Sequence, residues 1–286
     1  MTKALDFSDK VEAVRIMWEE GTVTEELCLC VSGSVSRGEQ TPHSDTDFLL
    51  LHQDSVSARN AAEEMLRRMH AELEHVSVIS RSLEHCRAMI DEDVRSWVSQ
   101  MDARWVVGTT DLFEAYRKDM CIQAEHSHGK VLTDIYTLTM ERHRQYGETL
   151  ALLEPNIKNS AGALRDIHTM YYIALLDRAR TLCGSGNHWT SVVDALSQLK
   201  LQSERKSQLL DAYEFILSTR AAMHACSGHL HDTLDFDLQQ SVAAYLEYGP
   251  EKDKRGVESF MRDYYKHAHT VHIALQLVFS DEQLGG

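Results

Sequence analysis

Two aspartates separated by one residue, Asp45 and Asp47, stand directly before a short apolar run. Earlier in the chain the apolar run Leu27–Val31 leads into a Gly33-Ser34 turn. Residues i and i+2 of a strand point to the same side, so both carboxylates can face one hard cation. A helix that begins near Ser34 directs unpaired N–H groups and its positive dipole end toward a phosphate. These features together predict a site for metal-dependent nucleotidyl transfer.

The order of Gly33-Ser34, Arg37-Gly38-Glu39 and the Asp45-x-Asp47 pair resembles the catalytic motif of nucleotidyltransferases of the DNA polymerase β type. Within that superfamily it is similar to the uridylyltransferases that modify the nitrogen-regulatory PII protein. Later segments are similar, in the same order, to the helical domain that follows the catalytic domain in that family: 153–168, 232–239 and 260–268. The resemblance runs from about Glu25 to about Leu275.

The resemblance implies transfer of UMP from UTP, with Mg²⁺ or Mn²⁺ as the cofactor, to a tyrosine hydroxyl of a PII-like protein in nitrogen regulation. Asp45 and Asp47 would hold metal ions that shield the triphosphate and activate the attacking hydroxyl. Ser34 and the amides around Gly33 would hold the β- and γ-phosphates, so that pyrophosphate is the leaving group.

A third acidic ligand belongs to the family's motif, and this sequence offers Glu72 and Glu74 for it. Both precede the predicted strand 75–80, and strand alternation would place them on one side. We choose Glu74. If neither carboxylate lies near Asp45 and Asp47, a catalytically inactive nucleotide-binding regulatory module becomes the better interpretation. Among enzymes the alternative is adenylyl transfer to another protein or a small molecule, since the motif fixes the reaction and not the base or the acceptor.

Three basic residues are further candidates for nucleotide binding. Arg37 either contacts phosphate or pairs with Glu39 to brace the turn. Lys158 and Arg165 lie in a dense polar segment that opens a helix. The functional interpretation places Lys158 or Arg165 near phosphate, and the alternative is a salt-bridged hinge between domains.

Composition narrows the choice of partners. The 286 residues carry a formal net charge of −15, which opposes binding to the phosphates of nucleic acids. No apolar run approaches the ~20 residues of a membrane-spanning helix, and the N-terminus lacks the pattern of a signal peptide. The six cysteines form no Cys-x-x-Cys pair, as is typical of reduced thiols. We expect a cytoplasmic protein that binds neither nucleic acid nor a membrane.

Histidine is abundant, but clusters such as His126-Ser-His128 fit no metalloenzyme pattern, so we expect surface histidines. By resemblance, full-length PII uridylyltransferases carry a metal-dependent His-Asp phosphohydrolase domain that removes UMP. The one His-Asp dipeptide here, His231-Asp232, lies in the part similar to the helical domain. We therefore expect no UMP-removing activity from these residues.

The hydrophobic pattern predicts an α+β protein with two domains. Residues 1–125 are expected to form a nucleotidyltransferase α/β domain with a small mixed sheet, and residues 126–286 an all-helical bundle. The first domain shows strand patterns at 27–32, 46–51, 75–80 and 105–107, and helical patterns at 9–20, at 57–70 with Ser57 as a cap, and near 110–119. The second shows helical patterns at 129–151, 163–183, 188–200, 203–227, 238–246 and 256–279.

Overall fold

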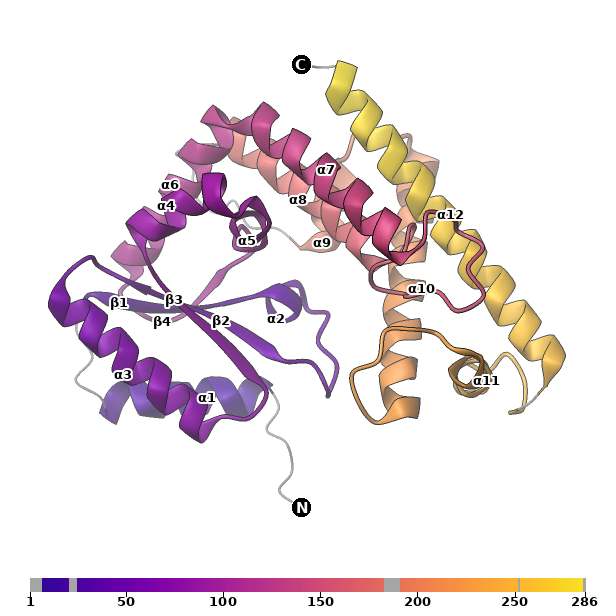
Figure 1. The fold of residues 1–286 in the computed structure, drawn as a ribbon, viewed down its shortest axis with the longest axis horizontal. Helices are drawn as coiled ribbons and strands as arrows, with labels where there is room; N and C mark the ends of the chain where they lie inside the picture. Colours follow the sequence, from indigo (N-terminus) through magenta and orange to yellow (C-terminus); the bar gives the residue numbers. More distant parts are fainter. Residues whose placement is uncertain (1–6, 21–24, 183–190, 252, 285–286) are drawn as a thin grey trace. The chain divides into compact units, whose positions relative to one another are not determined.

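The computed structural model describes residues 7–20, 25–182, 191–251 and 253–284. The chain divides into two compact units (Figure 1). The first holds the residues up to His128 together with the last turns of helix α8 (Leu164–Leu182), from Leu176 onward. The second holds Gly129–Leu175 and the chain from residue 190 onward. The α+β architecture predicted from the sequence is confirmed.

The first unit contains a mixed sheet of β1 (Leu27–Ser32), β2 (Thr46–His52), β3 (Val76–Ser82) and β4 (Arg104–Gly108). The strand order is β3-β2-β1-β4, with β1 antiparallel to β2 and β4, and β2 parallel to β3. A parallel pair needs a crossover connection, which α3 (Val56–Glu72) provides. The carboxyl end of β1 therefore meets the amino ends of β2 and β3 at one edge of the sheet.

Helices cover both faces of this sheet (Figure 1). On one face α1 (Phe7–Glu20) and α3 enclose a core to which β2 contributes Phe48 and Leu50. On the other face α4 (Leu83–Glu92) contacts β3, and α6 (Thr110–His126) contacts β1 and β2. Leu49 and Leu51 point to that second face because side chains alternate along a strand. Burial on both faces explains why the run after Asp47 is continuously apolar rather than alternating.

The structure corrects the sequence prediction in two places. The cap of α3 is Ser55, whose hydroxyl accepts a 2.9 Å hydrogen bond from the amide of Ala58, and not Ser57. The segment between β3 and β4 carries α4 and also α5 (Val94–Ser99), which the hydrophobic pattern did not reveal. Both are short helices with a polar N-cap, Ser82 for α4 and Asp93 for α5. Gly21, which directly follows the predicted helix at 9–20, lies outside the described residues.

The second unit is helical, and its described residues add only an isolated bridge between Asn156 and Thr233. Its core cluster includes Ile157, Leu234 and Phe260, which are fully buried. The prediction of an all-helical second half is confirmed, although the first helix ends before residue 151 and the last one is longer than predicted. The helices are α7 (His128–Tyr146), most of α8, α9 (Val192–Gln198), α10 (Ser203–Ser227), α11 (Phe236–Tyr245) and α12 (Lys254–Leu284).

Two partly buried histidines of α12 should make this unit sensitive to acid. Burial lowers the pKa of His267, and the charge of Lys266 acts in the same direction. Burial also lowers the pKa of His272, and the charge of Asp166 offsets only part of this. Since the unfolded chain takes up these protons first, the free energy of unfolding falls as pH drops through about 6.5 and is fully retained above it. We expect a lower melting temperature at about pH 5.5 than at about pH 7.5.

Substitutions of His267 and His272 test whether these two residues cause the loss of stability in acid. His267→Phe keeps an aromatic ring against Phe215, whose centroid lies 4.4 Å from that of His267, but cannot take up a proton. Combined with His272→Gln, it should flatten the dependence of melting temperature on pH. The exposed His269 provides the control, and His269→Gln should leave the dependence unchanged. If acid lowered the melting temperature of the double variant as much as that of the wild type, these histidines would not be the cause.

Candidate active site

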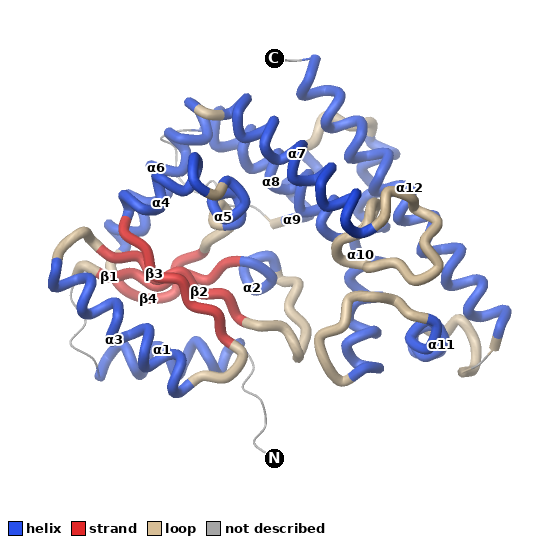
Figure 2. The backbone as a smooth tube through the Cα atoms, in the orientation of Figure 1, coloured by secondary structure: helices blue, strands red, loops and turns tan. Residues whose placement is uncertain are grey.

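The Gly33-Ser34 turn lies directly at the end of β1, where the short helix α2 (Gly33–Arg37) begins (Figure 2). Gly33 has a φ of 68°, a backbone conformation that favours glycine. A Cβ atom at this position would lie 2.5 Å from Oδ2 of Asp47. The register explains this closeness, because Ser32 is the direct partner of Asp47 in the antiparallel pair. Glycine at residue 33 therefore keeps open the space in which the Asp47 carboxylate meets the turn.

Asp45 and Asp47 lie at the amino end of β2, as the sequence predicts. The side chain of Asp45 is 55% exposed, and its Oδ1 lies 3.7 Å from Nδ1 of His75. The described acidic and histidine side chains at this edge do not form a ready metal site. No three of them place their ligand atoms within 4.8 Å of one another. Neighbouring carboxylates repel each other, so convergence on a common point requires a cation.

These residues fit a divalent metal ion. Asp45 and Asp47 offer carboxylate oxygens, which are the ligands that Mg²⁺ and Mn²⁺ prefer. One carboxylate is open to solvent, and the other borders the space that glycine at residue 33 keeps free. The roles assigned to both residues from the sequence stay predictions, and the geometry is compatible with them.

The two candidates for the third carboxylate occupy different elements. Glu72 is the last residue of α3, and its Oε1 lies 3.2 Å from Nε of Arg68 in the same helix. Strand alternation therefore does not relate Glu72 to Glu74, and this part of the prediction is wrong. Glu74 is exposed in the loop between α3 and β3. The carbonyl oxygen of the next residue, His75, accepts a 3.0 Å hydrogen bond from the amide of Thr46, which places this loop beside the start of β2.

Arg37 braces the turn through two buried carboxylates. Its Nε donates to Oε2 of Glu39 at 2.9 Å, and its Nη1 donates to Oδ2 of Asp102 at 2.6 Å. The side chain of Arg37 is only 5% exposed, and those of its two partners are 1% exposed. Of the two interpretations weighed from the sequence, the pairing with Glu39 is the one observed.

Asp102 was not found by sequence reasoning. Its Oδ1 accepts a 3.2 Å hydrogen bond from the amide of Gly33, so one carboxylate holds both ends of α2. The available signal was its place just before the fourth strand, which pairs with β1 through Val31 and Arg104. The amide of Gly33 already donates to Asp102, so it can contact a phosphate only if the phosphate displaces that carboxylate. The predicted phosphate contact by Ser34 does not require this displacement.

The Arg37-Gly38-Glu39 sequence has a local explanation as well. Gly38 has a φ of 73° and ends α2 in the left-handed conformation. The chain then turns back, and the amide of Glu39 donates to the carbonyl oxygen of Ser34 at 2.8 Å. The hydroxyl of Ser36, which is 2% exposed, donates to the carbonyl oxygen of Gly33 at 2.9 Å. The Ser36 side chain therefore lies inside the turn and does not project from it.

In the helical unit Lys158 belongs to a charged cluster around Asp232. Oδ2 of Asp232 lies 3.6 Å from Nζ of Lys158, and its Oδ1 lies 3.0 Å from Nε of Arg220 and 3.3 Å from Nε2 of His224. Burial alone would raise the pKa of Asp232, but the hydrogen bond from His224 and the charges of Arg220 and Lys158 hold it well below its usual range.

The basic side chains of this cluster also act on one another. Burial lowers the pKa of Lys158, and the charges of Arg165 and Arg220 act in the same direction. Lys158 and Arg220 thus share Asp232 as a counter-charge, and the charge of Arg165 also acts on Lys158. The His231-Asp232 dipeptide is explained by this arrangement, since its aspartate is held by basic groups.

The nearby Asp166 has a structural role. It is fully buried and accepts 2.7 Å hydrogen bonds from Nε2 of His143, Nη2 of Arg142 and the amide of Gly162. Nη1 of Arg142 also donates to the carbonyl oxygen of Asn159 at 2.9 Å. These bonds fix the loop that precedes α8, which agrees with the salt-bridged interpretation of this polar segment.

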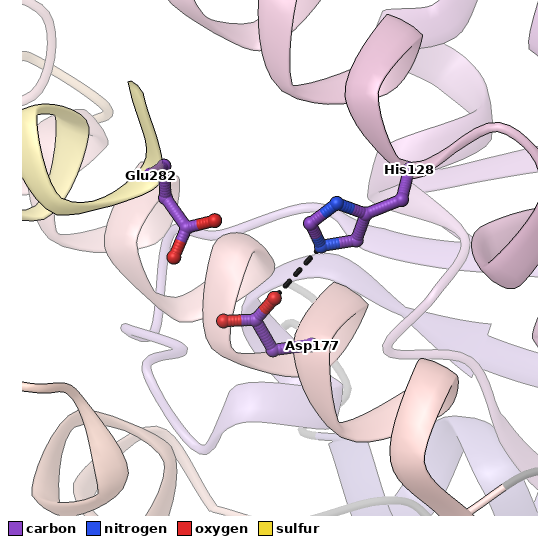
Figure 3. Close-up of side chains that lie close together, drawn as sticks. All are labelled: His128, Asp177 and Glu282. Carbon is purple, nitrogen blue, oxygen red and sulfur yellow. Dashed lines mark hydrogen bonds and ion pairs between the residues drawn. The ribbon is translucent and has the colours of Figure 1, made fainter. Parts of the chain in front are cut away.

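His128, expected from the sequence to be a surface histidine, is instead largely buried. Its Nε2 lies 2.7 Å from Oδ1 of Asp177, and the two side chains face each other (Figure 3). The His128 side chain is 13% exposed. The pair joins the first residue of α7 to the last turns of α8 within the first unit.

Comparisons with known proteins identify the family. The family model described as GlnD PII-uridylyltransferase matches residues 133–279, which is more than half of the chain, and the nucleotidyltransferase model DUF294 matches residues 11–102. The chain belongs to the GlnD PII-uridylyltransferase family. The resemblance stated from the sequence is thereby confirmed.

Curated relatives are similar over nearly the whole chain. The bifunctional uridylyltransferase/uridylyl-removing enzyme of Burkholderia thailandensis is 34% identical over 265 residues, which cover 91% of this chain and 29% of that protein. The enzyme of the same name from Burkholderia mallei is 34% identical over 267 residues, with the same coverage. The chain therefore spans less than a third of the length of these relatives. None of the described helices is long and apolar enough to cross a membrane.

Proposed function

We propose that this chain transfers UMP from UTP to a tyrosine hydroxyl of a PII-like regulatory protein, with Mg²⁺ or Mn²⁺ as the cofactor. The observation that carries the proposal is the strand-end arrangement of Gly33, Asp45 and Asp47 in a chain of the PII-uridylyltransferase family. The relatives are named for uridylyl transfer, which favours UTP as the donor.

Each part of the site has an assigned role in this proposal. Asp45 and Asp47 would hold the divalent metal, and Glu74 would complete the acidic ligand set from the loop before β3. A metal ion held by these residues would neutralise charge on the triphosphate and lower the pKa of the attacking hydroxyl. Ser34 orients the phosphates, and the Arg37 brace keeps its turn in place.

Lys158 and Arg165 are the proposed phosphate-binding residues of the helical unit. The basic groups around Asp232 support this assignment, because an incoming phosphate can share the cations of the cluster. Lys158 is more accessible than Arg220, with its side chain 31% exposed against 6% for Arg220.

A labelling experiment tests the proposal. The purified protein is incubated with Mg²⁺, a PII-like protein and each α-labelled nucleoside triphosphate in turn. We expect label from UTP on a tyrosine of the acceptor, and its loss when EDTA removes the metal. Label from ATP alone would establish adenylyl transfer instead. The protein would be an inactive regulatory module if it bound a triphosphate in a metal-dependent manner but transferred no label, either to the PII-like protein or to proteins of a host lysate.

A further inference from the structure

A buried lysine contacts the start of β2 and the residue before β3, next to the candidate metal ligands. Lys10 of α1 is 5% exposed, and lysine is seldom buried without partners. Its Nζ donates to Oγ1 of Thr46 at 3.2 Å and to the carbonyl oxygen of His75 at 3.0 Å. Thr46 separates Asp45 from Asp47, and His75 follows Glu74. One ammonium group thus contacts the neighbours of all the proposed acidic ligands.

The backbone at His75 has an unusual conformation. Its φ of 52° lies in the left-handed region, which residues other than glycine seldom adopt. Its carbonyl oxygen accepts hydrogen bonds from both Nζ of Lys10 and the amide of Thr46. Conformations of this kind persist where the surroundings hold them in place. The two donors therefore fix how the chain leaves Glu74 and enters β3.

Lys10 lies on the face of the sheet opposite to the one toward which the Asp47 side chain points. Thr46 alternates with Asp45 and Asp47 along the chain, and it is buried on the face that α1 covers, together with Phe48. The ammonium group therefore stands behind the carboxylates and does not line the side on which they would meet a metal and a nucleotide. Its contacts are with a hydroxyl and a carbonyl oxygen, which suits a role in position rather than in chemistry.

We propose that Lys10 is a positioning residue of the metal site, which ties the start of β2 to the loop before β3 so that Asp45, Asp47 and Glu74 can converge on one ion. The inference rests on the proposed function, because it assumes that these carboxylates hold the metal. It adds a residue from the first helix, far from the motif in sequence, to the machinery of the site.

The charge of Lys10 and its position predict opposite effects of removing it. A cation near Asp45 opposes the binding of a second cation, so loss of charge alone would strengthen metal binding. Loss of the hydrogen bonds from Lys10 to Thr46 and His75 would release the loop at His75 and weaken metal binding. Supporting contacts behind metal ligands change metal affinity by about 10- to 100-fold when they are removed. We therefore expect the dissociation constant for Mn²⁺ to rise by at least about tenfold in Lys10→Met.

The experiment titrates the full chain with Mn²⁺ alone and follows the free ion by electron paramagnetic resonance, so that no turnover is needed. Arg15→Met is the matched control, because it removes the same charge from an exposed position of the same helix. It should bind Mn²⁺ as the wild type does. Lys10→Arg keeps a cationic donor and should recover part of the loss. Unchanged or tighter binding in a folded Lys10→Met protein would overturn the proposal.

Two more variants keep the outcome decisive. If Lys10→Met does not fold, Thr46→Val removes one acceptor of the tie while preserving the shape of the side chain, and wild-type affinity for Mn²⁺ in this variant would overturn the proposal. Asp45→Asn tests the proposed function in the same titration. Wild-type binding by Asp45→Asn would show that the metal site lies elsewhere. Loss of binding in Asp45→Asn together with unchanged binding in Lys10→Met would reject the positioning role alone.

Discussion

Asp45→Asn and Asp47→Asn are each expected to lower kcat/KM for the proposed UMP transfer by about 10³-fold or more. An amide oxygen binds Mg²⁺ much more weakly than a carboxylate, and losing about 4 kcal/mol of metal-dependent stabilisation of the transition state corresponds to this factor. The fold should survive, because Asp45 is exposed directly before the first residue of β2 and no core side chain is changed. Asp45→Asn is the cleaner of the two variants, since the Asp47 carboxylate also lies against Gly33.

Binding measurements separate loss of the metal from loss of chemistry. A ligand at a hundredfold excess over its Kd stabilises the native protein by about 2.7 kcal/mol. A non-hydrolysable UTP analogue should therefore raise the melting temperature of the wild type in Mg²⁺, and much less in EDTA or in Asp45→Asn. Asp54→Asn is the matched control: Asp54 follows β2 and pairs with Arg59 at 3.5 Å on the surface. Wild-type rates in both folded Asp45 and Asp47 variants would remove these residues from the site.

The elements that carry the motif were predictable because their signals are local. The apolar run 27–31, the Gly33-Ser34 turn and the run after Asp47 each define a strand or its end within a few residues, and β1 begins and ends where the sequence predicts. The choice of Ser57 over Ser55 as a cap shows the limit of such signals. Both are serines near a helix start, and only the backbone decides which hydroxyl meets an amide.

The residues that hold the site together were not predictable, because their contacts join distant parts of the chain. Asp102 lies 65 residues from Arg37, and Lys10 lies 65 residues from His75. A single carboxylate before a strand or a lysine on an amphipathic helix reads as a solvated group until the sheet order is known. The strand order β3-β2-β1-β4 is what brings these residues to the edge where the motif lies.

Arg37→Met is expected to lower the free energy of unfolding of the first unit by about 3–5 kcal/mol at neutral pH. The guanidinium is the observed partner of Glu39 and Asp102, whose side chains are 1% exposed. Removing one partner from a buried ion pair leaves charge without compensation in a poorly solvated place. Urea unfolding of the variant and the wild type measures the difference. Arg59→Met, which removes an exposed pair with Asp54, should change stability by less than about 1 kcal/mol.

The pH dependence of this variant distinguishes buried charge from simple loss of packing. Without the guanidinium, Glu39 and Asp102 would ionise less readily in the folded protein than in the unfolded chain. The folded variant then binds more protons, so the stability gap to the wild type should narrow as pH falls toward about 5. A gap of constant size would instead point to lost packing of the arginine stem. Because Asp102 also accepts the amide hydrogen bond of Gly33, the same substitution should loosen the turn beside Asp47 and reduce the proposed UMP transfer even where the variant remains folded.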